Sequence, residues 1–116
     1  VAQRFAPKIS KQIPGIAKLM QLLKITKEYR TPYDHLMLHI HDTMKANLEY
    51  QKNVSQAELR FPPGSTWIVY TDCVSHAAMT GQHLFEQTFH LPVSAMQNPE
   101  FSPINILEKI CKRRLS

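Results

Sequence analysis

The sequence predicts an α+β fold, with helices towards both ends of the chain and a block of short strands between them. Two observations predict it: apolar residues recur at helical spacing near the ends, whereas residues 57–91 hold alternating, β-branched and aromatic runs. Proline and glycine separate these runs. The chain has 116 residues, of which 43% are hydrophobic, so it can bury a core and we expect one domain or most of one.

Two short helices are expected before residue 30. Apolar residues four positions apart predict the first helix, and Pro7 would have to lie near one of its ends. A second helix would begin at Pro14, with its lysines off the apolar stripe. The apolar residues that predict these helices are Val1, Phe5 and Ile9 for the first and Ile16, Leu19, Met20 and Leu23 for the second.

The alternating run at residues 36–41 predicts a strand that is followed directly by a helix. One face of the strand would carry Leu36, Leu38 and Ile40, and the other Met37, His39 and His41. Asp42 would then cap a helix over residues 42–50, because a carboxylate at that position accepts the free amide protons of the first turn.

The second half predicts several strands and a closing helix. Extended segments are expected at residues 57–61, 66–71, 73–79 and 83–91, with turns at Pro62-Pro63-Gly64 and Thr80-Gly81-Gln82. Ser102 before Pro103 predicts the start of the closing helix. The apolar stripe of that helix would consist of Ile104, Leu107, Ile110 and Cys111.

The charge and the cysteine content indicate the kind of partner and the cellular compartment to expect. The formal net charge is +5, partly from the cluster Lys112-Arg113-Arg114, and such an excess favours anionic partners. No RNA-binding aromatic motif or zinc-finger spacing is present, so nucleic acid is not expected. Cys73 and Cys111 do not resemble a secreted disulfide framework, and we expect a cytoplasmic protein with free thiols.

Two histidine patterns are candidates for a metal site. His39 and His41 would share one face of the predicted strand, where the ordinary alternative is a polar, half-exposed surface. His76 follows a Pro-Gly turn, a strand and a polar break, which is the layout that double-stranded β-helix dioxygenases use for their second iron-binding histidine. Their iron also needs a His-x-Asp or His-x-Glu pair, and no histidine here begins one.

Several strings in order resemble the Kdo hydroxylase family, and together they span nearly the whole chain. They are RTPYDH at residues 30–35, HDTMK at 41–45, YQ at 50–51, FPPGSTWIVYTD at 61–72, VSHAAM at 74–79 and EQTF at 86–89. The resemblance implies hydroxylation of 3-deoxy-D-manno-oct-2-ulosonic acid (Kdo) at C3 within lipid A precursors, with Fe(II), 2-oxoglutarate and molecular oxygen. It also implies that residues 1–116 are the C-terminal portion of one jelly-roll dioxygenase domain.

The same resemblance assigns roles to residues of this chain. His76 would be the distal iron ligand. In many related dioxygenases, the next strand carries a basic residue that holds 2-oxoglutarate; here Gln87 and Thr88 stand in that strand without an Arg or Lys. The sugar acid would meet His41, Asp42 and Lys45, although Asp42 is as well explained as a helix cap and Lys45 as a solvated side chain.

Two other functions also fit parts of the sequence. One alternative is a small non-enzymatic module that binds an anionic lipid or nucleic acid, and another is a metal hydrolase built on His39, His41, Asp42 and Asp72.

The family's His-x-Asp pair lies upstream of the matching strings, and the chain starts with Val1 rather than methionine. We therefore expect a missing N-terminal part, an inactive isolated chain, and peripheral contact of the complete enzyme with the inner membrane.

Overall fold

The structure, a computed structural model, describes residues 1–116 as helices, turns and extended coil. The α-helices are α1 (Ala2–Phe5), α2 (Ile16–Leu22), α3 (Pro32–Ala46), α4 (Leu48–Asn53) and α5 (Pro103–Cys111). Three short 3-10 helices, η1 (Ala6–Lys8), η2 (Val93–Ala95) and η3 (Pro99–Phe101), lie between them. Because the structure contains no β-strand, the predicted α+β fold and the jelly-roll architecture are wrong.

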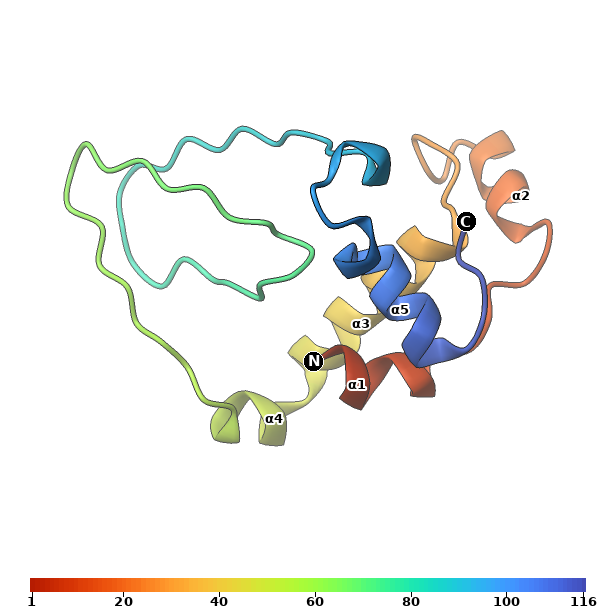
Figure 1. Ribbon diagram of the computed structural model, residues 1–116, viewed down its shortest axis with the longest axis horizontal. Helices are drawn as coiled ribbons and strands as arrows, with labels where there is room; N and C mark the ends of the chain where they lie inside the picture. Colours follow the sequence, from red (N-terminus) through yellow and green to blue (C-terminus); the bar gives the residue numbers. More distant parts are fainter.

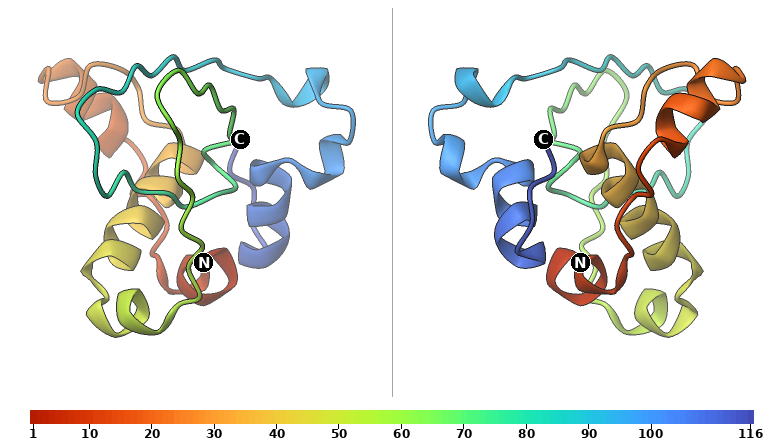
Figure 2. Two further views of the ribbon diagram at one scale, coloured as in Figure 1. Left: turned by 90° about the vertical axis from the view of Figure 1, so that its left-hand side faces the viewer. Right: turned by 90° about the vertical axis from the view of Figure 1, so that its right-hand side faces the viewer.

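The helices gather on one side of the molecule, and residues 54–92 leave them in one long excursion (Figure 1). The excursion begins after α4 and returns to the helices at η2. Helix α1 packs against both α3 and α5, and the side views show it near the ends of those two helices (Figure 2). The molecule therefore has a small helical body with a large loop attached.

Helix α3 is the longest element, and its start is specified locally. The Thr31 side chain accepts a hydrogen bond from the Asp34 amide at 3.1 Å, and the Asp34 carboxylate accepts one from the Thr31 amide at 2.9 Å. This is a capping box, which satisfies two of the amide groups that the first turn leaves free. Pro32 stands at the first helical position, where its missing N–H costs nothing.

The predicted strand at residues 36–41 lies inside α3, so this prediction was wrong. Leu36 and Ile40 are buried, as both interpretations require, because residues four apart share a face of a strand and also of a helix. Leu38 separates the two interpretations: it lies about 200° around the helix from Leu36 and is 37% exposed. Asp42, expected as a helix cap, instead lies within the helix.

The core is small and is formed by α1, η1, α3, α5 and the end of the chain. It consists of Phe5, Ala6, Leu36, Ile40, Leu107 and Leu115. Tyr50 of α4 closes one side, with its ring meeting Phe5 edge-on at a centroid distance of 5.1 Å. Burial of these side chains is the main favourable term that holds α1, α3 and α5 together.

The terminal helices largely agree with the prediction, whereas α2 agrees only in part. Helix α5 begins after Ser102, whose side chain accepts from the Asn105 amide, and it buries Leu107 as the predicted stripe requires. A short first helix is present, with Pro7 in the 3-10 turn that ends it. Helix α2 is shorter than expected, and it buries Ala17 while much of its predicted stripe is exposed.

The excursion contains none of the four strands expected at residues 57–61, 66–71, 73–79 and 83–91. Its Pro-Gly turn does form: Gly64 has φ of +83°, and the Ser65 amide donates to the Pro62 carbonyl at 3.1 Å. However, Ile68 is 97% exposed and Phe85 is 99% exposed. A β-branched run becomes a strand only when another segment pairs with its backbone, and here no segment does so.

Candidate functional site

His76 lies in the excursion, where its ring is held in one orientation by its own backbone. Its Nδ1 atom is 3.0 Å from the Val74 carbonyl oxygen, and since a carbonyl can only accept, Nδ1 carries the hydrogen. In the neutral imidazole, the lone pair is then on Nε2. A histidine that binds a metal through one nitrogen commonly donates from the other to a backbone carbonyl in this way.

An aromatic stack supports the His76 ring. Trp67 meets it edge-on with ring centroids 5.7 Å apart, and Phe61 stacks on Trp67 at 5.3 Å. Aromatic pairs at such distances contribute about 0.5–1.5 kcal/mol beyond the area they bury. The stack therefore gives His76 a local platform within a segment that has no regular secondary structure.

Two contacts connect residues 72–76, here called the His76 segment, to α3. The Tyr33 hydroxyl donates to the Asp72 carboxylate at 2.6 Å, which joins the start of α3 to the turn before His76. Burial of Tyr33, reinforced by the neighbouring Asp72 charge and hydrogen bond, raises the pKa of its phenol well above the ordinary value. The Ser75 hydroxyl lies 3.5 Å from the sulfur of Met44, a residue in the last third of the helix.

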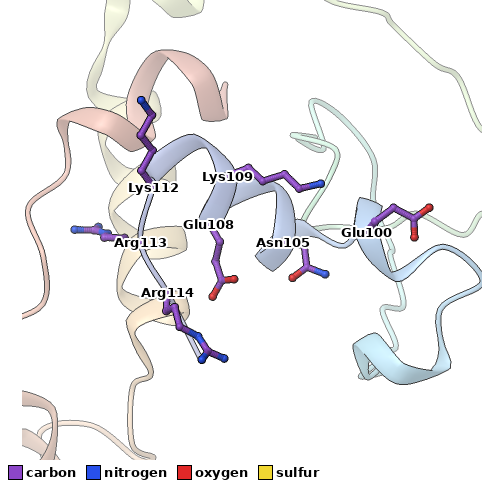
Figure 3. Close-up of a pocket in the computed structure, with 7 residues that line it drawn as sticks. All are labelled: Glu100, Asn105, Glu108, Lys109, Lys112, Arg113 and Arg114. Atoms are coloured by element: carbon purple, nitrogen blue, oxygen red, sulfur yellow. The ribbon is translucent and has the colours of Figure 1, made fainter.

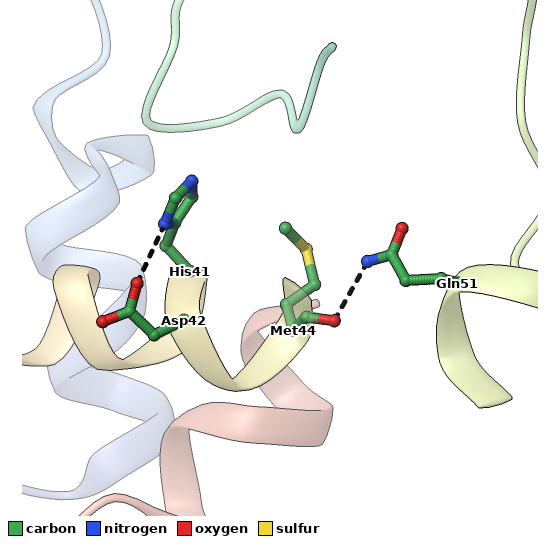
Figure 4. A network of polar contacts seen from close by, with 4 residues as sticks. All are labelled: His41, Asp42, Met44 and Gln51. Atoms are coloured by element: carbon green, nitrogen blue, oxygen red, sulfur yellow. Dashed lines mark hydrogen bonds and ion pairs between the residues drawn. The ribbon is translucent and has the colours of Figure 1, made fainter. Parts of the chain in front are cut away.

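The Ser75 contact places the His76 segment over the turn of α3 that carries the predicted sugar-binding residues. His41, Met44 and Lys45 share one face of the helix because residues three and four apart are neighbours on a helical surface. His41 Nδ1 lies 3.3 Å from a carboxylate oxygen of Asp42, and both side chains are exposed (Figure 4). Gln51 donates to the Met44 carbonyl at 3.0 Å and so links α4 to the same turn.

The other sequence candidates are placed differently. Gln87 and Thr88 are exposed in the later part of the excursion and make no hydrogen bond, so their role towards 2-oxoglutarate stays a prediction. His39 and His41 do not share a strand face, because in α3 they lie about 200° apart around the axis. His39 instead packs edge-on against His35, with ring centroids 4.3 Å apart.

The fit of this chain to an iron site is partial. His76 uses Nδ1 for the Val74 carbonyl, which leaves Nε2 for one ligand position. No three His, Cys, Asp or Glu side chains come together where they could hold a metal ion. The residues present therefore fit one position of a three-residue iron site, and they do not assemble the whole of it.

Sequence reasoning missed the roles of Tyr33 and Asp72 in positioning the His76 segment. Both residues lie within strings that resemble the family, but they are 39 positions apart and no local pattern links them. Burial and the neighbouring Asp72 also raise the pKa of the Cys73 thiol, which favours its uncharged form beside this turn. The only sign of this contact in the sequence is that the tyrosine and the aspartate each lie in a string that resembles the family.

Comparisons with known proteins complete the description of the chain. A family model described as 3-deoxy-D-manno-oct-2-ulosonic acid (Kdo) hydroxylase matches residues 1–114. No curated protein and no solved structure matches the chain. None of the helices has the length and apolar character needed to cross a membrane.

Proposed function

Because this chain belongs to the Kdo hydroxylase family, we propose that it is the part of a 2-oxoglutarate-dependent oxygenase that supplies one iron ligand and part of the sugar site. The reaction would hydroxylate Kdo at C3 within a lipid A precursor. Iron, 2-oxoglutarate and molecular oxygen together supply the oxidation that inserts one oxygen atom into a carbon–hydrogen bond. The observation that carries this proposal is the orientation of His76, with Nδ1 committed to a carbonyl and Nε2 free.

The proposed division of labour follows from the sequence. Two histidines and a carboxylate form the usual iron-binding face of such oxygenases. No histidine of this chain is followed two positions later by Asp or Glu, so the other two ligands would come from outside residues 1–116. Trp67 and the Val74 carbonyl would hold the His76 ring in place for them.

The exposed turn of α3 would meet the sugar acid. Kdo carries a carboxylate, and Lys45 and His41 lie on the same helix face as Met44, beside the His76 segment. Lys45 would attract the carboxylate, and the His41–Asp42 pair would hydrogen-bond to sugar hydroxyl groups. Gln87 and Thr88 would donate hydrogen bonds to 2-oxoglutarate. A cytoplasmic enzyme at the inner face of the membrane suits a lipid-linked acceptor.

The test uses the complete enzyme with Fe(II), 2-oxoglutarate and a Kdo-bearing lipid A precursor. His76→Ala should abolish the gain of one oxygen atom by the acceptor, measured by mass spectrometry, while the melting temperature changes little. His83→Ala is the matched control, because His83 is an exposed histidine in the same excursion and makes no hydrogen bond. This control variant should keep normal turnover and normal iron content.

Two results would contradict the proposal. Normal turnover per folded molecule in His76→Ala, with a lowered melting temperature, would make His76 a structural residue. Hydroxylation by residues 1–116 alone would contradict the placement of two iron ligands outside this chain. In the proposed arrangement the isolated chain binds Fe(II) only weakly and does not couple 2-oxoglutarate breakdown to hydroxylation.

A further inference from the structure

A groove of about 450 Å³ lies where three distant segments of the chain meet, away from the His76 segment. The start of α2 with the residues before it, the start of α3 with Tyr29, and the end of the chain after α5 line it. Its cationic lining residues are Lys11, Arg113 and Arg114, and Ile13 and Pro14 are among its apolar ones. Its volume falls within the range of about 300–1,000 Å³ that is usual for small-ligand pockets.

The charge of the groove has a single sign. Three cations line it and no carboxylate does. A second groove of about 470 Å³ beside α5 differs, because Glu100 and Glu108 line it together with cations (Figure 3). Arg113 and Arg114 lie on the border and contribute to both grooves, whereas Lys109 and Lys112 line only the mixed one.

The chain after α5 is folded back so that its arginines reach this place. Lys112 adopts the left-handed conformation with φ of +51°, which ends the helix, and Glu108 accepts a hydrogen bond from the Leu115 amide at 2.7 Å. Leu115 is buried in the core, which fixes the turn between them. Figure 3 shows Lys112, Arg113 and Arg114 leaving the chain in different directions, so they do not form one flat basic patch.

Arg113 has an unused donor at this position. Its Nε atom is buried and has no hydrogen-bond partner. A buried donor without a partner is unfavourable, and an anion that draws the Arg113 side chain towards the groove would provide one. Arg113 and Arg30 also help to lower the pKa of His35, behind burial and the neighbouring His39, so His35 senses the positive charge of this region.

We propose that this groove is a binding site for a phosphate monoester carried on a sugar or lipid body. A phosphate offers several acceptor oxygens to guanidinium and ammonium donors, and Ile13 and Pro14 offer apolar contact to the body that carries it. The site is separate from His76 and does not depend on the proposed oxygenase reaction. Under the proposed function, on which this assignment rests, the ligand is a phosphate of the lipid A precursor.

Binding is measured with the 116-residue chain and two probes, glucosamine 1-phosphate in solution and phosphatidylcholine vesicles that contain phosphatidic acid. Lys11→Glu and Arg114→Glu should each raise the Kd for glucosamine 1-phosphate about tenfold, the loss of one charge-assisted contact. Lys109→Glu makes the same charge change on α5 outside the groove, and its Kd should stay within about twofold of the unchanged chain. Added glucosamine 1-phosphate should also raise the His35 pKa in an NMR titration, because it offsets Arg113.

The outcomes separate the site from a general charge effect. If glucosamine 1-phosphate releases the chain from the vesicles, the natural source is a lipid; if only the soluble probe binds, the source is a soluble sugar phosphate. The proposal fails if Lys109→Glu weakens binding as much as Lys11→Glu, or if neither probe binds. Since no step of this test requires turnover, its failure and the failure of the oxygenase proposal are independent.

Discussion

His35 is the residue whose surroundings most clearly predict a pH dependence of stability. Burial is the main cause that lowers its pKa below the ordinary value of 6.5, and the positive potential of His39, Arg113 and Arg30 adds to it, while the Ser10 backbone acts in the opposite direction. Its Nε2 atom is also buried without a partner. The folded protein therefore takes up a proton at His35 less readily than the unfolded chain does.

The sign of the pH dependence follows from this lowered pKa. The contribution of His35 to stability is complete above about pH 6.5 and is lost as the pH falls from there through the folded-state pKa. The melting temperature should therefore fall as the pH is lowered from about 6.5 towards about 5, and change little above that range. His35→Gln removes the titrating group and should flatten that fall, while His90→Gln at an exposed position should not. Parallel curves for all three proteins would contradict this explanation.

For the other residues of the candidate site, the sequence identified the residue types but not the contacts between them. The strings around His76 and His41 resemble the family closely enough to predict membership, which the family match confirms. The hydrogen bond of His76 to Val74 is local, because the two residues are two positions apart. The contact between Tyr33 and Asp72 could not be predicted, because it depends on how α3 and the excursion meet.

At the scale of elements, the capping box of α3 is the most informative local feature. Thr31→Ala removes the side chain that accepts from the Asp34 amide, and it should lower the free energy of unfolding by about 1 kcal/mol. The effect should extend to the whole fold, because α3 contributes Leu36 and Ile40 to the core. Urea unfolding followed by circular dichroism measures this loss.

Thr43→Ala is the matched control for this prediction. Thr43 is an exposed threonine in the interior of the same helix, where alanine has the higher helix propensity. That variant should be unchanged in stability or slightly more stable. An equal loss of stability in both variants would mean that the Thr31 cap contributes no more than an ordinary threonine side chain of this helix.

Elements that depend on residues close in sequence were predicted well, and the others were not. Helix α5 begins at the predicted Ser102–Pro103 boundary, and the Pro-Gly turn forms, because a cap or a turn involves residues at most four apart. The run at residues 36–41 has apolar side chains that suit both a strand and a helix. The capping box formed by Thr31 and Asp34 precedes this run and favours the helix, but the sequence analysis did not recognise it.

At the scale of the whole molecule, the chain exposes much more surface than its length suggests. Its accessible surface is 10219 Å², whereas a folded protein of this mass exposes about 6,500 Å². The radius of gyration is 16.4 Å, compared with about 13 Å for a compact domain of this length. Residues 54–92 contribute to the difference, since almost all of them are exposed.

Limited proteolysis should therefore divide the molecule in a defined way. Chymotrypsin should cut first within residues 54–92, where Phe85 and Phe89 are exposed and the backbone has few hydrogen bonds. The two remaining pieces should stay associated on a sizing column, because Phe5 and Leu36 pack with Leu107 and Leu115 across the cut. First cuts within α3 or α5, or immediate separation of the pieces, would contradict this architecture.

The sequence by itself determined the family, the start of α5, the Pro-Gly turn and the chemistry offered by His76, since each of these depends on nearby residues or on the residue strings themselves. Only the tertiary structure decided that residues 36–41 form a helix and that residues 57–91 do not form strands. It also decided that Lys11 shares a groove with Arg114. The physical reason is that strands and composite sites need partners distant in sequence, and alternation or charge along the chain does not specify which segments meet.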